Sequence, residues 1–176
     1  MKEKLLKVMP EFTLISDQDL REKTIVVWLE ALKRGGWTVD DLSRIPFTLL
    51  IKDCPVSMLE HNRGVVGVCS EAEKVLRQIY GEKMPINRDV LIAGAILHDV
   101  GKLLEYREEN GAFTKSKMGK LLRHPISGAA LCAEMGLPEE VTHIVAVHSK
   151  EGDGVKRTPE AVILHHADFT NFETLH

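Results

Sequence analysis

The sequence predicts an all-α protein. Apolar residues recur at helical spacing along most of the chain, Gly and Pro residues separate these segments, and the alternating patterns typical of strands are scarce. The chain has 176 residues, of which 44% are hydrophobic and 28% charged. This composition is typical of a folded globular protein that can bury a core of its own. We therefore expect one compact helical domain over residues 1–176.

The first long helix is expected to begin after Ser16 and Asp17, because both side chains suit an N-terminal cap. Apolar residues then keep roughly to one face until Gly35 and Gly36 end the helix. A mixed connector follows, and a second long helix is expected over residues 56–80, closed by glycine and proline.

The almost entirely apolar run VLIAGAILHDV predicts the central, buried helix. A polar excursion over residues 105–116 follows it, with a short hairpin expected around Asn110 and Gly111. Helical pattern resumes near Lys117, and three further helices are expected to open near Pro125, Pro138 and Pro159.

Composition excludes several classes of protein. A formal net charge of -3 offers no broad basic surface, so no extended nucleic-acid surface is expected. No secretory signal pattern and no apolar run of membrane length occur, which makes the cytoplasm the expected location, without membrane attachment. The three cysteines form no C-x-x-C pair, and Cys69 and Cys132 are interpreted as buried thiols because both lie in apolar helical stretches.

His98 and Asp99 are adjacent in the sequence, where the buried central helix is expected to end. A buried carboxylate needs a partner, and a metal ion or a hydrogen-bonded structural pair explains these two residues equally well. Other histidines and one aspartate fall on different predicted helices, so a helical bundle could gather all of them around two cations, with Asp99 as a bridge. The set comprises His61, His98, Asp99, His124, His148 and Asp168.

The sequence resembles the HD-domain (HDIG-type) metal-dependent phosphohydrolases. The resemblance runs over about residues 56–172, and the segment 1–55 lies outside it as an expected accessory helical segment. It rests on an ordered series of strings, EHNRGVV, ILHDVGK, HPISGA, AVHSKEGDG and HHADF. A cyclic-dinucleotide specificity is not implied, because the chain has His148-Ser149-Lys150 where that subclass carries His-His-Glu.

The resemblance implies an HD-domain helical bundle that binds divalent metal, with two ions expected and Fe, Mn, Zn and Mg all compatible with the ligands. It implies His61, His98, Asp99 and Asp168 as the core ligands, with His124 and His148 as the added ligands of two-metal members. Asp99 is also expected to act in catalysis as the bridge that helps to orient water. Lys102 is expected to face the site, and Arg63 is a weaker candidate for contact with phosphate.

The leading hypothesis is metal-dependent hydrolysis of a nucleotide or another small phosphate ester. Two alternatives stay open: an HD-fold di-iron oxygenase that uses the same ligand series, and a non-catalytic, metal-stabilised module that binds a nucleotide. The pocket is expected to take its shape from residues 105–116 and 150–158. The N-terminal segment could form the interface of a homodimer.

Overall fold

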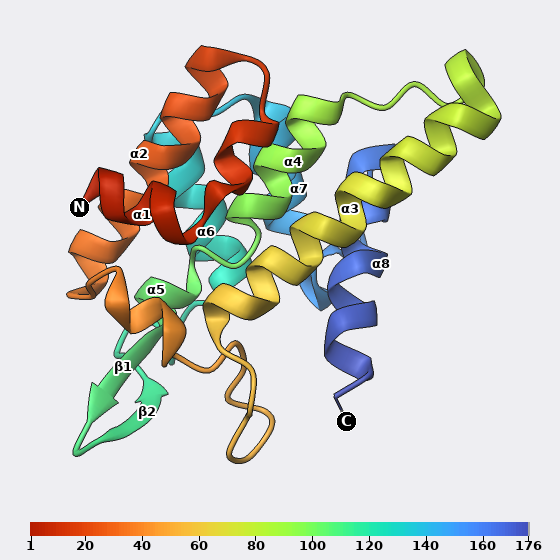
Figure 1. The fold of residues 1–176 in the computed structure, drawn as a ribbon. Helices are drawn as coiled ribbons and strands as arrows, with labels where there is room; N and C mark the ends of the chain where they lie inside the picture. Colours follow the sequence, from red (N-terminus) through yellow and green to blue (C-terminus); the bar gives the residue numbers. More distant parts are fainter. Residues whose placement is uncertain (176) are drawn as a thin grey trace.

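The computed structural model describes residues 1–175, and it confirms the all-α prediction (Figure 1). The longer elements are helices that pack around a shared core, and two short strands form a hairpin at one end. The helices are α1 (Lys2–Val8), α2 (Gln18–Gly35), α3 (Met58–Tyr80), α4 (Arg88–Leu97), α5 (Lys102–Glu105), α6 (His124–Glu134), α7 (Glu139–Val147) and α8 (Pro159–Glu173). Short 3-10 turns occupy Pro10–Leu14, Asp40–Ser43, Gly81–Lys83 and Lys150–Gly152.

The cap and the glycine end predicted for the first long helix are confirmed, and the second long helix has a cap that was not predicted. Asp17 accepts a hydrogen bond from the backbone N–H of Leu20 at the start of α2, and Gly36 ends that helix in the left-handed conformation with φ 75°. Ser57 and Glu60 form a reciprocal capping box at the start of α3. These local signals set where each helix begins and therefore which side chains face the core.

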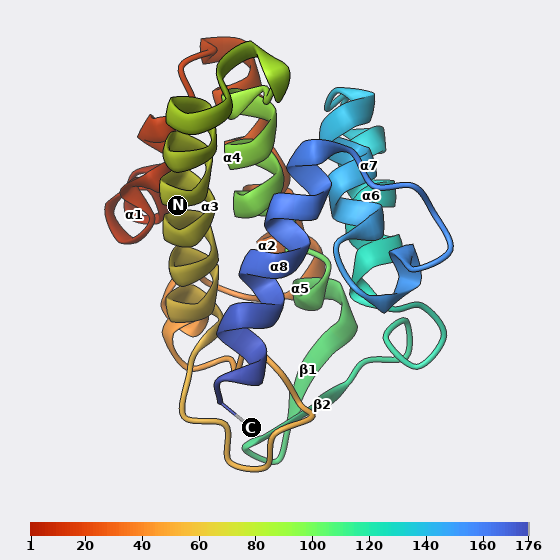
Figure 2. The ribbon, with the colours of Figure 1, turned by 90° about the vertical axis from the view of Figure 1, so that its right-hand side faces the viewer.

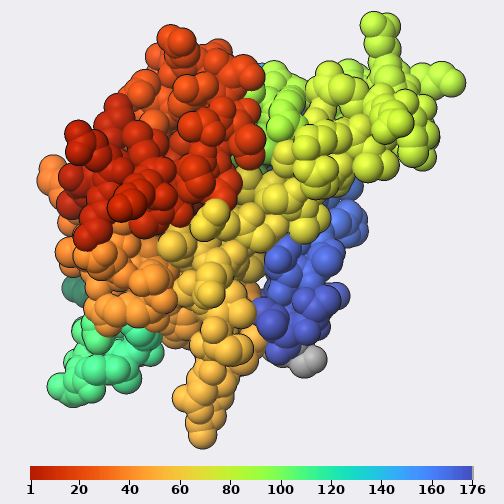
Figure 3. Space-filling view, viewed as in Figure 1, coloured from red at the N-terminus to blue at the C-terminus, as the bar shows by residue number. Residues whose placement is uncertain are grey.

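The polar excursion after α5 contains the predicted hairpin. Strands β1 (Tyr106–Glu109) and β2 (Ala112–Lys115) pair antiparallel, with Tyr106 opposite Lys115. Asn110 and Gly111 both take positive φ, 52° and 78°, as a two-residue primed turn requires. The hairpin projects from the body of the molecule (Figure 3).

The expectation that a helix resumes near Lys117 is wrong, because the chain forms turns there and α6 begins only at His124. Gly119 lies so close to α5 that an added Cβ would fall 2.1 Å from the carbonyl oxygen of Glu105. The apolar residues of this segment find no core to cover, and Leu121 is 78% exposed. The helical pattern therefore had no face to bury, and packing against α5 favoured turns instead.

Helix α4 lies at the centre of the bundle. It contacts α2, α3, α7 and α8, and every residue from Val90 to Leu97 is buried (Figures 1 and 2). The carbonyl oxygen of Ile96 accepts hydrogen bonds from the Trp28 indole N–H of α2 and from the Asn62 side-chain amide of α3, each at 3.0 Å. Carbonyls in the last turn of a helix lack intrahelical partners, so these side chains satisfy one of them. They also fix the point from which His98 and Asp99 leave the helix.

None of the helices in the described part of the chain has both the length and the apolar character needed to cross a membrane.

Trp28→Phe is expected to lower the free energy of unfolding by about 1–3 kcal/mol, because it deletes one hydrogen bond to Ile96 and leaves space in a closed core. Urea denaturation followed by circular dichroism measures the loss. Val26→Ala, on the same helix at a position that is 41% exposed, serves as the control and should change the free energy by no more than about 0.5 kcal/mol. Equal losses in the two variants would contradict the proposed anchoring of α4.

Candidate metal centre

The structure brings all six predicted metal ligands to one place. His61 projects from the first turns of α3, and His98 and Asp99 follow the last residue of α4. The other three come from the second half of the chain: His124 begins α6, His148 follows α7, and Asp168 lies in α8. All are buried except Asp168, whose side chain is 15% exposed.

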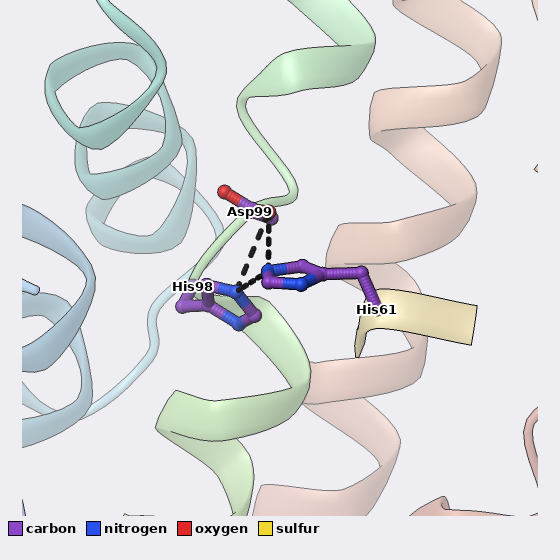
Figure 4. Close-up of side chains that lie close together, drawn as sticks. All are labelled: His61, His98 and Asp99. Carbon is purple, nitrogen blue, oxygen red and sulfur yellow. Dashed lines mark hydrogen bonds and ion pairs between the residues drawn. The ribbon is translucent and has the colours of Figure 1, made fainter. Parts of the chain in front are cut away.

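The first group of donors consists of His61, His98 and Asp99, which converge from α3 and from the end of α4 (Figure 4). The Nε2 atoms of the two imidazoles are 3.4 Å apart, and Asp99 Oδ2 lies 3.5 Å from His61 Nε2 and 3.4 Å from His98 Nε2. Asp168 adds a fourth donor, because its Oδ1 atom lies 3.1 Å from His61 Nε2 and 3.9 Å from His98 Nε2.

The second group of donors uses the other oxygen of the same carboxylate. Asp99 Oδ1 lies 3.2 Å from His124 Nε2 and 3.8 Å from His148 Nε2, and these two imidazole atoms are 3.3 Å apart. Asp99 therefore presents one oxygen to each pair of histidines. The carboxylate is thus shared by both groups of residues that could hold a metal ion.

The spacing of the donors fits divalent metal ions. Donor atoms about 2.1 Å from a shared ion lie about 3.0–3.4 Å apart at octahedral or tetrahedral angles. The distances within the two groups run from 3.1 to 3.9 Å, so small side-chain adjustments suffice to bring each group around one ion. Imidazole and carboxylate together are also a donor set that such ions prefer.

The outer nitrogens of three imidazoles are held by other groups, which turns each Nε2 inward. Nδ1 of His98 lies 2.7 Å from the carbonyl oxygen of Ala95, and Nδ1 of His148 lies 2.8 Å from that of Val145. Nδ1 of His124 instead lies 3.0 Å from a carboxylate oxygen of Glu105. Such contacts favour the tautomer whose Nε2 carries a free lone pair. The His61 ring is stacked on Phe47, with ring centroids 4.3 Å apart.

Burial and neighbouring charges hold most of these groups in the forms that bind metal. Burial, together with His98 and His124, lowers the pKa of His148 to about 3. Burial tends to raise the pKa of Asp99, but Lys102 and His98 outweigh it and hold that pKa well below its usual range. Burial likewise opposes protonation of His98, yet the nearby carboxylates raise its pKa. The centre thus favours an added positive charge, which a metal ion supplies.

Lys102 reaches the centre, as the sequence predicted. Its Nζ atom donates hydrogen bonds to Asp99 Oδ2 at 2.6 Å and to the carbonyl oxygen of Phe47 at 2.5 Å. Burial alone would lower the pKa of this ammonium, but Asp99 outweighs that effect and the pKa is raised. Lys102 therefore stays charged and balances part of the negative charge of the centre.

The structure does not bring Arg63 to the centre. Its Nε atom is 2.6 Å from a carboxylate oxygen of Glu11, on the exposed side of α3. Two residues along a helix turn the side chain by about 200°, so Arg63 faces away when His61 faces inward. The predicted contact between Arg63 and a phosphate group is not supported by this geometry.

A pocket of about 540 Å³ opens above the centre. Asp99, Lys102, His124 and Asp168 contribute to its lining. The wall combines apolar and aromatic side chains with basic ones. The apolar and aromatic residues are Phe47, Leu49, Leu50, Tyr106, Phe169 and Phe172, and the basic ones, besides Lys102, are Lys115, Arg123 and Lys150.

Both segments expected to shape the pocket contribute to it, 105–116 through the hairpin and 150–158 through the turn after α7. Sequence reasoning missed the wall around Phe47, the basic Arg123, and the contact between Glu105 and His124. None of these belongs to a periodic pattern or a motif. Only the packing of the connector, α5 and α6 brings them to the pocket.

Comparison with known proteins gives two kinds of match. The model of the HD domain family matches residues 58–170. Dihydroneopterin 2',3'-cyclic phosphate phosphodiesterase of Methanocaldococcus jannaschii is 32% identical over 180 residues, covering 94% of this chain and 67% of that protein. The 3'-5' exoribonucleases YhaM of Listeria welshimeri and Listeria innocua are 31% and 33% identical over 150 residues. This chain spans about half the length of those exoribonucleases, 47% of each.

No solved structure matches the chain significantly. The family model covers more than half of the chain, and the archaeal relative matches nearly all of it. The match to the family also agrees with the helical fold and with a buried group of His and Asp side chains that could hold metal. The chain belongs to the HD domain family, as a metal-dependent phosphohydrolase.

Proposed function

We propose that the chain hydrolyses a small cyclic phosphodiester carried by a heteroaromatic compound, such as a nucleoside or a pterin, with the help of two divalent metal ions. One observation carries the proposal: the two oxygens of Asp99 face separate pairs of histidines at the base of a pocket. The name of the archaeal relative supports the substrate class, because that protein acts on a 2',3'-cyclic phosphate and aligns with 94% of this chain.

The six candidate ligands would hold the two ions, His61, His98 and Asp168 on one side of Asp99 and His124 and His148 on the other. When bound, such ions polarise a phosphoryl oxygen and lower the pKa of a bound water molecule to near neutrality. Four imidazoles favour transition metals such as Mn, Fe or Zn over Mg. All six residues come from one chain, so the proposed site requires no homodimer.

The reaction consumes one water molecule and breaks one P–O ester bond of the ring, which leaves a phosphate monoester and a free hydroxyl group. Lys102 keeps Asp99 in place and adds positive charge at the base of the pocket, where negative charge develops on phosphate. Lys115, Arg123 and Lys150 are suited to bind the non-bridging oxygens.

The apolar part of the wall would receive the ring of the substrate. Phe169 and Phe172 line the pocket together, with ring centroids 6.5 Å apart. A volume of about 540 Å³ suits a small molecule rather than an extended polymer. Basic side chains for phosphate and aromatic side chains for a planar ring line the same pocket, which suits a small phosphate ester that carries such a ring.

The same ligands are compatible with oxygen-dependent di-iron chemistry and with a metal-stabilised module that only binds its ligand. The phosphodiesterase and exoribonuclease names of the relatives support hydrolysis over both.

Removing metal with a chelator should abolish hydrolysis of dihydroneopterin 2',3'-cyclic phosphate or a 2',3'-cyclic nucleotide. Added Mn²⁺ should restore it under strictly anaerobic conditions, with ³¹P NMR measuring the monoester formed. A requirement for oxygen, or full turnover by metal-free protein, would overturn the proposal.

Asp99→Asn is expected to reduce the metal content of purified protein and to lower kcat by at least about a hundredfold, because the shared ligand loses its charge. Elemental analysis and the same hydrolysis assay measure the two effects. Asp19→Asn removes an exposed carboxylate that is paired with Lys23 at 2.7 Å on α2, and should match the wild type. Circular dichroism shows whether each variant is folded, and normal metal content in folded Asp99→Asn would contradict the bridging role.

Phe169→Ala is expected to raise KM about tenfold for a cyclic phosphate that carries a heteroaromatic ring, since stacking of one ring contributes about 1–3 kcal/mol. For a cyclic phosphate that carries no heteroaromatic ring, KM should change little. Val162→Ala, at an exposed position of the same helix, is the control. The same increase in KM with both substrates would show that the aromatic wall does not bind the ring.

A further inference from the structure

Glu105 is the last residue of α5, and its side chain is only 3% exposed. One carboxylate oxygen, Oε2, accepts a hydrogen bond from the backbone N–H of His124 at 2.7 Å and lies 3.0 Å from Nδ1 of the same residue. The carboxylate therefore holds both the backbone and the ring of a candidate metal ligand. No motif in the sequence marks this residue.

The position of His124 explains why another element must supply this contact. His98 and His148 follow their helices, so carbonyls three residues earlier on the same chain, those of Ala95 and Val145, reach their Nδ1 atoms. His124 is the first residue of α6, and it does not follow the last turn of a helix as His98 and His148 do. Its Nδ1 atom needs a partner from elsewhere, and Glu105 is that partner.

We propose that Glu105 is the positioning residue for the second metal ion, the one between His124, His148 and Asp99. This inference rests on the two-ion site of the proposed function. By accepting the Nδ1 proton, Glu105 keeps His124 in the tautomer whose Nε2 lone pair faces Asp99 Oδ1 at 3.2 Å. A carboxylate partner also makes the imidazole a stronger donor than a carbonyl partner does. The first ion, held through His61 and His98, has no such dependence on Glu105.

The other oxygen of Glu105 connects the second ion to the basic part of the pocket. Oε1 lies 3.3 Å from Lys115 Nζ and 3.8 Å from Arg123 Nε, and both cations line the pocket. The surrounding backbone fixes Glu105 itself, since its carbonyl oxygen accepts a hydrogen bond from Ser116 N–H at 2.8 Å. One buried carboxylate thus orients a metal ligand and two groups suited to bind phosphate.

Glu105→Gln tests the proposal, because glutamine keeps the size of the side chain but removes its charge. Metal-free protein is titrated with Mn²⁺ in equilibrium dialysis, and bound metal is measured by elemental analysis. The second ion has three candidate ligands and the first has four, so the second is expected to bind more weakly. Its dissociation constant is expected to rise about 10- to 100-fold, while that of the first stays within about twofold. Circular dichroism of the metal-free protein checks that the variant is folded.

Glu151→Gln is the matched control. Glu151 lines the same pocket and carries the same charge as Glu105. Its Oε1 atom also lies near Arg123, at 3.6 Å from Nε. In the described part of the chain, no hydrogen bond or ion pair joins it to a candidate ligand. The control should bind both ions like the wild type. An equal loss in the two variants would assign the effect to the charge of the pocket and overturn the positioning role.

Two further outcomes separate this inference from the proposed function. Two ions bound with unchanged affinity in Glu105→Gln would overturn the role of Glu105 and leave the two-ion site intact. A wild-type protein that binds only one ion would overturn the two-ion site and, with it, this inference. If Glu105→Gln does not fold, Glu105→Asp gives the second test, because it keeps the charge but draws the carboxylate away from His124. The dissociation constant of the second ion should again rise while that of the first stays within about twofold, and an unchanged second constant would overturn the role of Glu105.

Discussion

The buried carboxylate of Asp99 is the group around which the protein is organised. An unpaired charge in such an interior costs several kcal/mol, and the surroundings of Asp99 are arranged to balance it. Lys102 donates a hydrogen bond to one oxygen at 2.6 Å. Four imidazoles face the two oxygens, those of His61, His98, His124 and His148. The packing of α4 between four helices is what brings these groups together. Loss of that packing would expose the same charges to water and disperse the donors.

The place of each histidine at the start or the end of a helix determines which group holds its Nδ1 atom. His98 and His148 stand just after α4 and α7, where free carbonyls of the last turn are available to hold their outer nitrogens. His124 stands at the start of a helix and therefore depends on the carboxylate of Glu105. The difference between the two ends of a helix thus predicts a difference between the two proposed ions. The second oxygen of Glu105 also connects the proposed catalytic centre with basic side chains of the pocket.

Much of the fold could be predicted from the sequence because its signals are local. The cap at Asp17, the left-handed Gly36 and the Asn110–Gly111 turn each act within a few residues. The segment after Lys117 shows the limit of such signals. Its apolar spacing suits a helix, yet the close approach of Gly119 to the Glu105 backbone holds it in turns, and a residue with a Cβ could not approach as closely.

The sequence by itself determined that the protein is helical and which six side chains could share a metal centre, because ligand types and their order along the chain survive without coordinates. Only the tertiary structure decided which oxygen of Asp99 faces which histidines, and that Arg63 pairs with Glu11 rather than facing the centre. It also decided that Glu105, Arg123 and Phe47 belong to the site. The reason is physical: these contacts join segments that are distant in sequence, and side-chain direction depends on how the helices pack.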